Sequence, residues 1–360
     1  MIQSIQSIRQ SFQALRADEN MRHRDIAKRL EMSEGELIAT FLDIDRMPLA
    51  VGEMQAVRLL PKWADIMVSI ELLGEVMALT RNASCVHEKV GIYKNASQDG
   101  PVGLLVGEID LRIFYHAWAH GFAVLEMTKG GLQRSLQFFD KAGVAIHKIH
   151  MKPQSCIAKY DALLQQFQSH DQTPGIQVTD PDKPAAELPD QDIDVTAWHQ
   201  SWRAMQDTHD FFVLLRQFKV TRTQGLRLAE PEFVQALPVT CAKDLLEIAA
   251  SASTPLMVFV GNPGMLQIHS GPIQKAMSVG SWINVMDPRF NLHLKMDSIA
   301  QAWLVRKPTD DGIVTSVELF NDTGEAIAMF FGERKPGTPE LTAWRALVDE
   351  LLARSTAIEA

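Results

Sequence analysis

The spacing of apolar residues predicts helices in both halves of the chain. Apolar side chains recur every three or four residues over 23–30 and again over 211–218, and each run is followed by a Ser or Thr suited to cap the next helix. The same period over 64–80 and 239–252 predicts a second helix in each half, and a final helix is expected over 343–354. The two halves therefore begin with the same kinds of element.

Alternating apolar and polar positions predict β-hairpins, and the same hairpin is encoded twice. Residues 135–146 match 316–327 position for position, and Gly143 and Gly324 each close a short turn that calls for positive φ. The match continues upstream at the same offset, which indicates an internal duplication.

A segment rich in Pro, Asp and Gln separates the two copies. Residues 168–195 lack apolar periodicity and cannot bury enough surface to order themselves. We therefore expect an N-terminal repeat over 1–167, a linker over 168–195 and a C-terminal repeat over 196–360. The predicted fold class is α+β, a tandem structural repeat in which each half is a large antiparallel β-sheet flanked by helices, with the helices on one side of the sheet.

Composition excludes several classes of protein. With 360 residues, 46% of them hydrophobic, the chain is globular, and its net charge of −9 argues against a main role in neutralising phosphate. Three scattered cysteines disfavour a disulfide framework and a zinc site, and they indicate a reducing compartment. The N-terminus lacks a signal-peptide core, and the apolar run 326–331 is far too short to cross a bilayer. We expect a cytoplasmic protein that is not embedded in a membrane.

Residues 22–37 have a superficial likeness to a helix-turn-helix. An amphipathic helix carrying Arg22, Arg24, Lys28 and Arg29 precedes a turn, as in DNA-reading motifs. A pair of packing helices explains the same pattern, and the acidic total charge predicts weak attraction to DNA. A DNA-binding regulator is therefore a minor alternative, and nucleic acid is not an expected partner.

The second copy carries a histidine and cations that suit a planar ligand. His209 opens an apolar helix, and the cations downstream are Arg216, Arg222, Arg227, Lys307 and Arg334. The apolar strand face contains Phe259, Ile268, Phe330 and Phe331. Haem matches this set, because its iron accepts an imidazole, apolar groups bury its macrocycle, and its propionates pair with Arg or Lys. Spacing alone leaves open that His209 and the cations are simply solvated.

Seven other histidines compete with His209 as iron ligands. Several lie at alternating strand positions, where a ring nitrogen usually bonds the protein itself, so core or surface roles are expected. They are His87, His116, His120, His147, His150, His269 and His293.

Eleven stretches, in order along the chain, resemble the HemS-type haemin-degrading or haemin-transport factors, which are cytoplasmic proteins of bacterial haem uptake. The stretches are Leu79–Asn82, His87–Lys89, Ile109–Arg112, Arg134–Asp140, Asp207–Phe212, Phe259–Asn262, Gln267–His269, Trp282–Asn284, Phe290–Leu294, Val305–Pro308 and Phe331–Pro336. The resemblance runs essentially end to end and implies a tandem repeat of large antiparallel sheets flanked by helices.

The resemblance also implies roles for individual residues. His209 is the expected axial ligand, and Arg112 from the first half is expected on the opposite face, directly or through water. Three cations are expected to hold the propionates, namely Arg222, Lys307 and Arg334. Phe259 and Phe331 are expected to line the pocket. Some relatives have a tyrosine near position 331, so phenylalanine here leaves apolar contact without a phenolic hydrogen bond.

The expected function is a haem-binding protein that takes up imported haem and either degrades it to release iron or passes it on. A pure haem chaperone or storage protein is the alternative. For degradation, Arg112 would serve as the catalytic residue beside an open face of the haem. The sequence encodes no flavin or nicotinamide site, so an enzyme of this kind would need an external reductant. The expected partners are an inner-membrane haem importer or a downstream haem acceptor.

Overall fold

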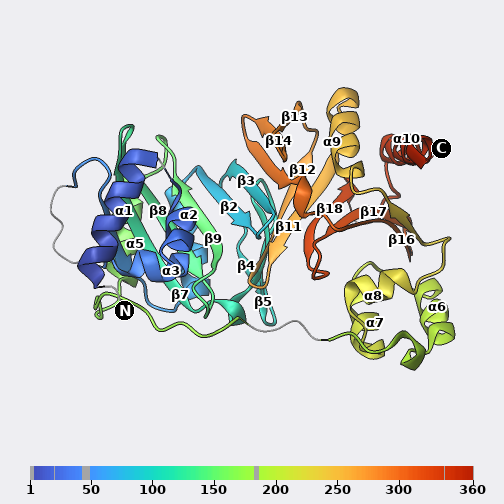
Figure 1. The fold of residues 1–360 in the computed structure, drawn as a ribbon, viewed down its shortest axis with the longest axis horizontal. Helices are drawn as coiled ribbons and strands as arrows, with labels where there is room; N and C mark the ends of the chain where they lie inside the picture. The colour runs from blue at the N-terminus through green and yellow to red at the C-terminus, as the bar shows by residue number, and fades with distance from the viewer. Residues whose placement is uncertain (1–3, 20, 43–48, 182–185, 336, 360) are drawn as a thin grey trace. The chain divides into compact units, whose positions relative to one another are not determined.

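The computed structural model describes residues 4–19, 21–42, 49–181, 186–335 and 337–359, and the chain divides into two compact units (Figure 1). Unit 1 comprises Met1–Arg81, Glu88–Asp182 and Asn262–Gln267. Unit 2 comprises Asn82–His87, Lys183–Gly261 and Ile268–Ala360. Each unit thus contains most of one half of the sequence and a short segment from the other half.

Two nine-stranded sheets form the framework, with strand orders β1-β7-β8-β9-β2-β3-β15-β14-β13 and β10-β16-β17-β18-β11-β12-β6-β5-β4. The strands of the first half of the sequence are β1 Met54–Arg58, β2 Val76–Arg81, β3 Cys85–Gly91, β4 Ser97–Asp99, β5 Val102–Leu105, β6 Asp110–Phe114, β7 His120–Thr128, β8 Gly131–Phe139 and β9 Ala145–Met151. Those of the second half are β10 Val234–Leu237, β11 Leu256–Asn262, β12 Met265–Gly271, β13 Ala276–Val279, β14 Trp282–Asp287, β15 Phe290–Lys295, β16 Gln301–Thr309, β17 Gly312–Phe320 and β18 Ala326–Gly332.

The predicted duplication is confirmed in the antiparallel hairpins β8-β9 and β17-β18. Gly143 has φ 74° and Gly324 has φ 79°, the left-handed conformation that glycine adopts without a steric penalty. The register of each hairpin shifts at the same place, between Phe138 and Phe139 in one and between Leu319 and Phe320 in the other. The predicted fold class, a tandem α+β repeat with large antiparallel sheets flanked by helices, is therefore confirmed.

In unit 1, helices cover both faces of the strands β1, β7, β8, β9 and β2. The helices α1 Ile5–Glu19, α2 His23–Arg29 and α3 Glu34–Ala39 share a core with Phe122 and Val124 of β7. The helices α4 Trp63–Ser69 and α5 Ile157–Phe167 share a separate core with Ala123 and Leu136. Because neighbouring residues on β7 point to opposite faces, the two cores lie on opposite sides of the sheet.

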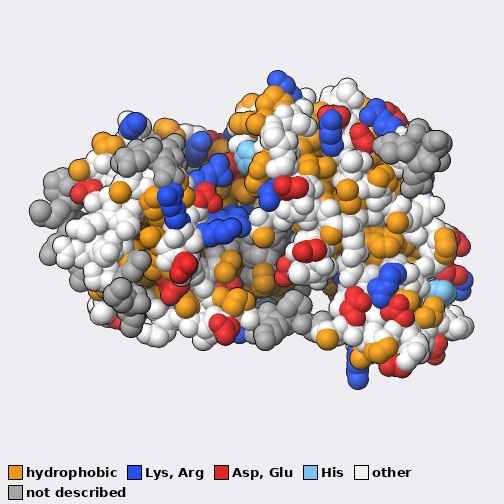
Figure 2. Space-filling view, in the orientation of Figure 1, with side chains coloured by type: hydrophobic (Ala, Val, Ile, Leu, Met, Phe, Trp, Pro, Cys, Tyr) orange, Lys and Arg blue, Asp and Glu red, His pale blue; other side chains and the backbone are white. Residues whose placement is uncertain are grey.

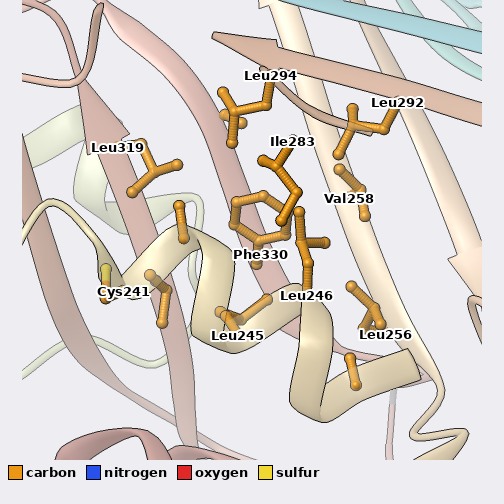
Figure 3. Packing of buried hydrophobic residues seen from close by; sticks show 14 of the residues in the cluster. Cys241, Leu245, Leu246, Leu256, Val258, Ile283, Leu292, Leu294, Leu319 and Phe330 are labelled. Carbon is orange, nitrogen blue, oxygen red and sulfur yellow. The ribbon is translucent and has the colours of Figure 1, made fainter. Parts of the chain in front are cut away.

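Unit 2 repeats this arrangement around β10, β16, β17, β18 and β11. The helices α6 Val195–Arg203, α7 Asp210–Phe218 and α8 Arg222–Arg227 share a core with Val305 and Phe320. The helices α9 Cys241–Ala252 and α10 Thr342–Glu359 share the other core with Leu304 and Leu319. Figure 3 shows Leu245 and Leu246 of α9 directed at the sheet side chains of this second core.

Two expectations from the sequence are corrected. Helices lie on both faces of each copy's strands, because the apolar period of a helix does not specify which face of a sheet it covers. The helix expected over 64–80 ends at Leu73, after α4 and the 3-10 turn Ile70–Leu73. Gly74 at φ 72° stops it, and β2 begins at Val76.

The remaining short elements are the 3-10 turns Tyr115–Ala117, Asp190–Asp192 and Met296–Ser298. In the part of the chain that the structure describes, no helix combines the length and apolar character needed to cross a membrane.

Candidate functional site

His209 lies at the start of α7, where its side chain is 87% exposed. One carboxylate oxygen of Asp207 accepts the backbone N–H of His209 at 2.7 Å and lies 2.5 Å from the ring atom Nδ1. Within the described residues, Nδ1 is thus occupied and Nε2 has no hydrogen-bond partner. A carboxylate that holds one ring nitrogen in this way orients the imidazole and leaves the other nitrogen for a metal.

Asp207 is suited to hold the imidazole because it stays ionised. The backbone N–H of His209 lowers the pKa of the Asp207 carboxyl, and the charge of Arg334 contributes in the same direction. Arg334 forms an ion pair with Asp311 at 3.1 Å and is partly buried. Arg334 therefore lies within electrostatic reach of the loop that carries His209.

Arg222 and Lys307 meet at a buried carboxylate, Glu318. Arg222 donates from Nε and Nη2 to the two oxygens of Glu318, both at 2.8 Å, and Lys307 donates from Nζ at 2.9 Å. The hydroxyl of Ser316 donates to the same carboxylate at 3.0 Å. Glu318 is fully buried and the Lys307 side chain is 4% exposed, so this is an interior charge cluster.

Local structure explains why these three charges converge. Thr221 caps α8 through the backbone N–H of Gln224, so α8 starts with Arg222 directed at the sheet. Burial alone would raise the pKa of Glu318, but the charges of Arg222 and Lys307 hold it well below its usual range. Burial lowers the pKa of Lys307, and the charge of Glu318 opposes that shift.

Aromatic rings of α7 lie under the two cations. Nζ of Lys307 is 4.7 Å from the centre of the Phe211 ring, and the guanidinium carbon of Arg222 is 5.0 Å from it. Arg222 also lies 5.6 Å from the ring of Phe212, which is half exposed. These distances are in the range of cation–π contacts. The helix α7, which directly follows His209, thus supports the cation cluster.

Phe259 and Phe331 contact each other, with ring centres 4.8 Å apart. Both are partly buried, and they lie on the adjacent strands β11 and β18. Phe259 is paired in register with Met329, whose sulfur is 3.3 Å from Nη2 of Arg222. The aromatic pair therefore adjoins the cation cluster through Met329.

Arg112 is the one predicted site residue in unit 1. It lies on β6, forms an ion pair with Asp110, and keeps about a third of its side chain exposed. Burial raises the pKa of Asp110, and the charge of Arg112 opposes that shift. The other six predicted site residues all lie in unit 2.

Sequence reasoning did not identify Glu318 or Asp207 as contributors. Glu318 carried no signal, because an acid between Val317 and Leu319 in a strand is also the pattern of a strand with one solvent-exposed face. Asp207 stood inside the stretch that carried the resemblance, two residues before the histidine.

The competing histidine His147 has a structural role. Its two ring nitrogens lie 2.8 Å from the Thr80 hydroxyl and 2.7 Å from the Tyr93 hydroxyl, and burial lowers its pKa to about 3. Among the described residues, no group of three or more His, Cys, Asp or Glu side chains is arranged to hold a metal ion.

Comparisons with known proteins identify the family. The model of the "Haemin-degrading HemS.ChuX domain" matches residues 43–167 and 219–351. The chain is 38% identical over 336 residues to the hemin transport protein HmuS of Yersinia pestis, covering 93% of this chain and 94% of that protein. It is also 38% identical over 327 residues to the hemin transport protein HemS of Yersinia enterocolitica, covering 89% and 90%.

Solved structures agree with the sequence comparisons. The haem-bound form of PhuS, a haem-binding protein from Pseudomonas aeruginosa, superimposes with a TM-score of 0.91 at 43% identity, covering 96% of this chain and 99% of PhuS. ChuS, described as an E. coli haem oxygenase, gives a TM-score of 0.83 at 34% identity, with the same coverage. The chain belongs to the HemS family of haemin-degrading and haemin-transport proteins.

Proposed function

We propose that this chain binds haem in unit 2, with Nε2 of His209 as the axial ligand of the iron. The observation that carries the proposal is the exposed His209 ring, which Asp207 holds at Nδ1 while Nε2 has no partner among the described residues. A neutral imidazole with one nitrogen fixed by a carboxylate is a common arrangement for metal-bound histidine. The haem-binding and hemin-transport proteins of the family support haem as the ligand.

The side chains around His209 provide the other groups that a haem requires. We assign the propionates to Arg222, Lys307 and Arg334, since charge-assisted hydrogen bonds from Arg and Lys suit carboxylates. We assign apolar contact with the macrocycle to Phe259 and Phe331, which already pack together.

Haem bound in this way is either degraded to release iron or passed on, and the family contains both kinds of protein. ChuS is described as a haem oxygenase, whereas HmuS and HemS are named hemin transport proteins. In the degrading reaction we assign the catalytic role to Arg112, and an external reductant supplies the electrons. In the transport role the partners are an inner-membrane importer and a downstream acceptor, in the cytoplasm. Iron release with a reductant, set against transfer of intact haem to an acceptor, distinguishes the two outcomes.

The DNA-binding alternative loses support from the burial of α3. The basic residues of α2 are exposed, and Lys and Arg side chains gather at the surface around this helix (Figure 2). In a helix-turn-helix, however, the second helix must present side chains to the base edges. Five of the six residues of α3 are buried, namely Glu34, Gly35, Leu37, Ile38 and Ala39.

The experiment that tests the proposal is a haemin titration followed by the Soret band. We expect the affinity of His209→Ala for haemin to fall by at least about a hundredfold, because the iron loses its protein ligand. His116→Ala is the matched control, since His116 is an exposed histidine of unit 1. Equal affinities in all three proteins would refute His209 as the ligand.

A further inference from the structure

The two copies of the repeat each hold one buried acid between two cations, and the first residue of the capped helix is the acid in one copy and a cation in the other. Ser33 caps α3 and Thr221 caps α8, each by accepting the backbone N–H three residues on. The first helical residue is Glu34 in one copy and Arg222 in the other. Glu34 pairs with Lys148 at 2.5 Å and with Arg81, whereas Arg222 pairs with Glu318.

The hydrogen bonds of Glu318 fix the orientation of Arg222. One edge of the guanidinium, formed by Nε and Nη2, is held by the two carboxylate oxygens of Glu318. The remaining nitrogen, Nη1, makes no hydrogen bond within the described part of the chain, and the Arg222 side chain is 16% exposed. A planar guanidinium held on one edge can bind a second carboxylate only through its remaining N–H groups.

The charges of the cluster do not balance. Arg222 and Lys307 contribute two positive charges, and Glu318 contributes one negative charge. Phe211 lies against both cations and supplies only its ring face. An interior cluster with one uncompensated positive charge is stabilised by one further anion.

We propose that Glu318 is a positioning residue that fixes Arg222 with Nη1 presented to a single carboxylate of the ligand. This inference rests on the proposed function and specifies its recognition step, in which one propionate enters this cluster. Glu318 does not contact the ligand. Glu318 holds the guanidinium in place and leaves the cluster with one positive charge, which one carboxylate can neutralise. Both effects favour a carboxylate over a neutral group.

The experiment compares two ligands, haemin and haemin dimethyl ester, in which both propionate carboxylates are blocked. The measured quantity is the preference, the ratio of the two dissociation constants. We expect the native protein to prefer haemin by at least about tenfold. In Glu318→Gln the amide cannot accept hydrogen bonds on both atoms, so we expect the preference to fall by about tenfold. In Arg222→Gln we expect the same fall, and in the double variant no further fall.

Glu34→Gln is the matched control, because it removes a buried carboxylate that also holds two cations but belongs to unit 1. Its preference for haemin is expected to equal that of the native protein. If Glu318 has only a structural role, Glu318→Gln would weaken the binding of both ligands equally. The preference would then stay unchanged, which would overturn the inference. An equal loss in Glu34→Gln, or no preference in the native protein, would overturn it as well.

Lys307→Met keeps the inference testable if Glu318→Gln does not fold. The substitution leaves Arg222 and Glu318 as a neutral pair, and methionine fits an apolar interior. We expect its affinity for the ester to stay within about threefold of native while its preference for haemin falls; an unchanged preference would contradict the charge argument. Failure of the native protein to bind haemin at all would refute the proposed function itself, an outcome distinct from unchanged preference in a protein that binds.

Discussion

The two copies of the repeat differ most where their helices meet the sheet. In β9 of the first copy, His150 is paired in register with Ser135, and in β18 of the second copy Phe331 is paired with Ser316. Phe331 packs against Phe259, whose counterpart in the first copy, at the repeat's near-constant spacing, is Leu79. The second copy therefore has aromatic side chains where the first has a titratable and an aliphatic one.

The two copies also differ in the surroundings of their buried acids. The first copy buries Glu34 between Lys148 and Arg81, and it holds a second acid, the partly buried Glu126, between Arg16 and His23. Both acids are held by basic residues of the same unit, as in a structural network. The second copy also holds one acid, Glu318, between two cations, but its cluster lies beside an aromatic pair and an exposed histidine. A duplicated fold thus supports an ion-pair network in one copy and a candidate ligand site in the other.

The largest expected effect is on the stability of the first copy. Glu34→Gln leaves Lys148 and Arg81 without their carboxylate, and breaking a buried pair of this kind costs about 3–5 kcal/mol. Chemical denaturation followed by circular dichroism measures this loss in the free energy of unfolding. The Soret spectrum of the haemin complex is expected to be unchanged. A shifted Soret band would contradict the division of roles between the copies.

The next effect concerns the imidazole of the second copy. Asp207→Asn removes the carboxylate that holds Nδ1 of His209, and loss of such a partner weakens metal binding by about 10- to 100-fold. The haemin titration measures this loss of affinity. Asp297→Asn is a suitable control, because Asp297 is an exposed acid of unit 2 that pairs with Lys295 and not with the histidine. An Asp207→Asn protein that binds haemin as tightly as native would show that the orientation of the ring is set elsewhere.

A smaller effect is the pH dependence that the first copy contributes. Burial first, and then the charges of Lys148 and His23, lower the pKa of His150 from 6.5 to about 4. Between these values the unfolded chain binds a proton that the folded chain does not. The free energy of unfolding therefore falls as the pH drops, by up to about 1.4 kcal/mol per pH unit.

His150→Asn is expected to reduce this slope, and His116→Asn, an exposed control, is expected to keep it. Denaturation curves recorded from pH 6.5 to 4 measure the slope. Equal slopes in the native and His150→Asn proteins would mean that His150 is not held neutral in the folded state.

The smallest effect concerns the aromatic pair of the second copy. Phe331→Tyr adds a hydroxyl beside the cation cluster, and one additional hydrogen bond to a propionate strengthens haemin binding by roughly 2- to 10-fold. Binding of the dimethyl ester is expected to change less. Equal gains for both ligands would show that the hydroxyl does not contact a carboxylate.

Much of the fold could be predicted from the sequence, because its signals are local. The apolar period over 211–218 predicts a helix that the structure places at Asp210–Phe218, and the repeated hairpins end at Gly143 and Gly324 as expected. The helix expected over 64–80 was too long, because the apolar spacing continues into a strand. Which sheet face a helix covers is set by tertiary packing and is not encoded in its period.

The candidate site could be predicted only in part. His209 and the cations were identified by residue type and by the resemblance to the family. Glu318 was not, because its role depends on Arg222, which lies 96 residues away in the sequence. A pattern of apolar and polar positions does not indicate which buried charges pair across such a distance.

We propose that one copy of the repeat, the second, binds haem through His209. The most direct test is the endpoint of a haemin titration at protein concentrations well above the dissociation constant, read from the Soret band. We expect one haem per chain in the native protein and in Glu34→Gln, with no sharp endpoint in His209→Ala. Two haems per chain, or a sharp endpoint that survives in His209→Ala, would contradict it.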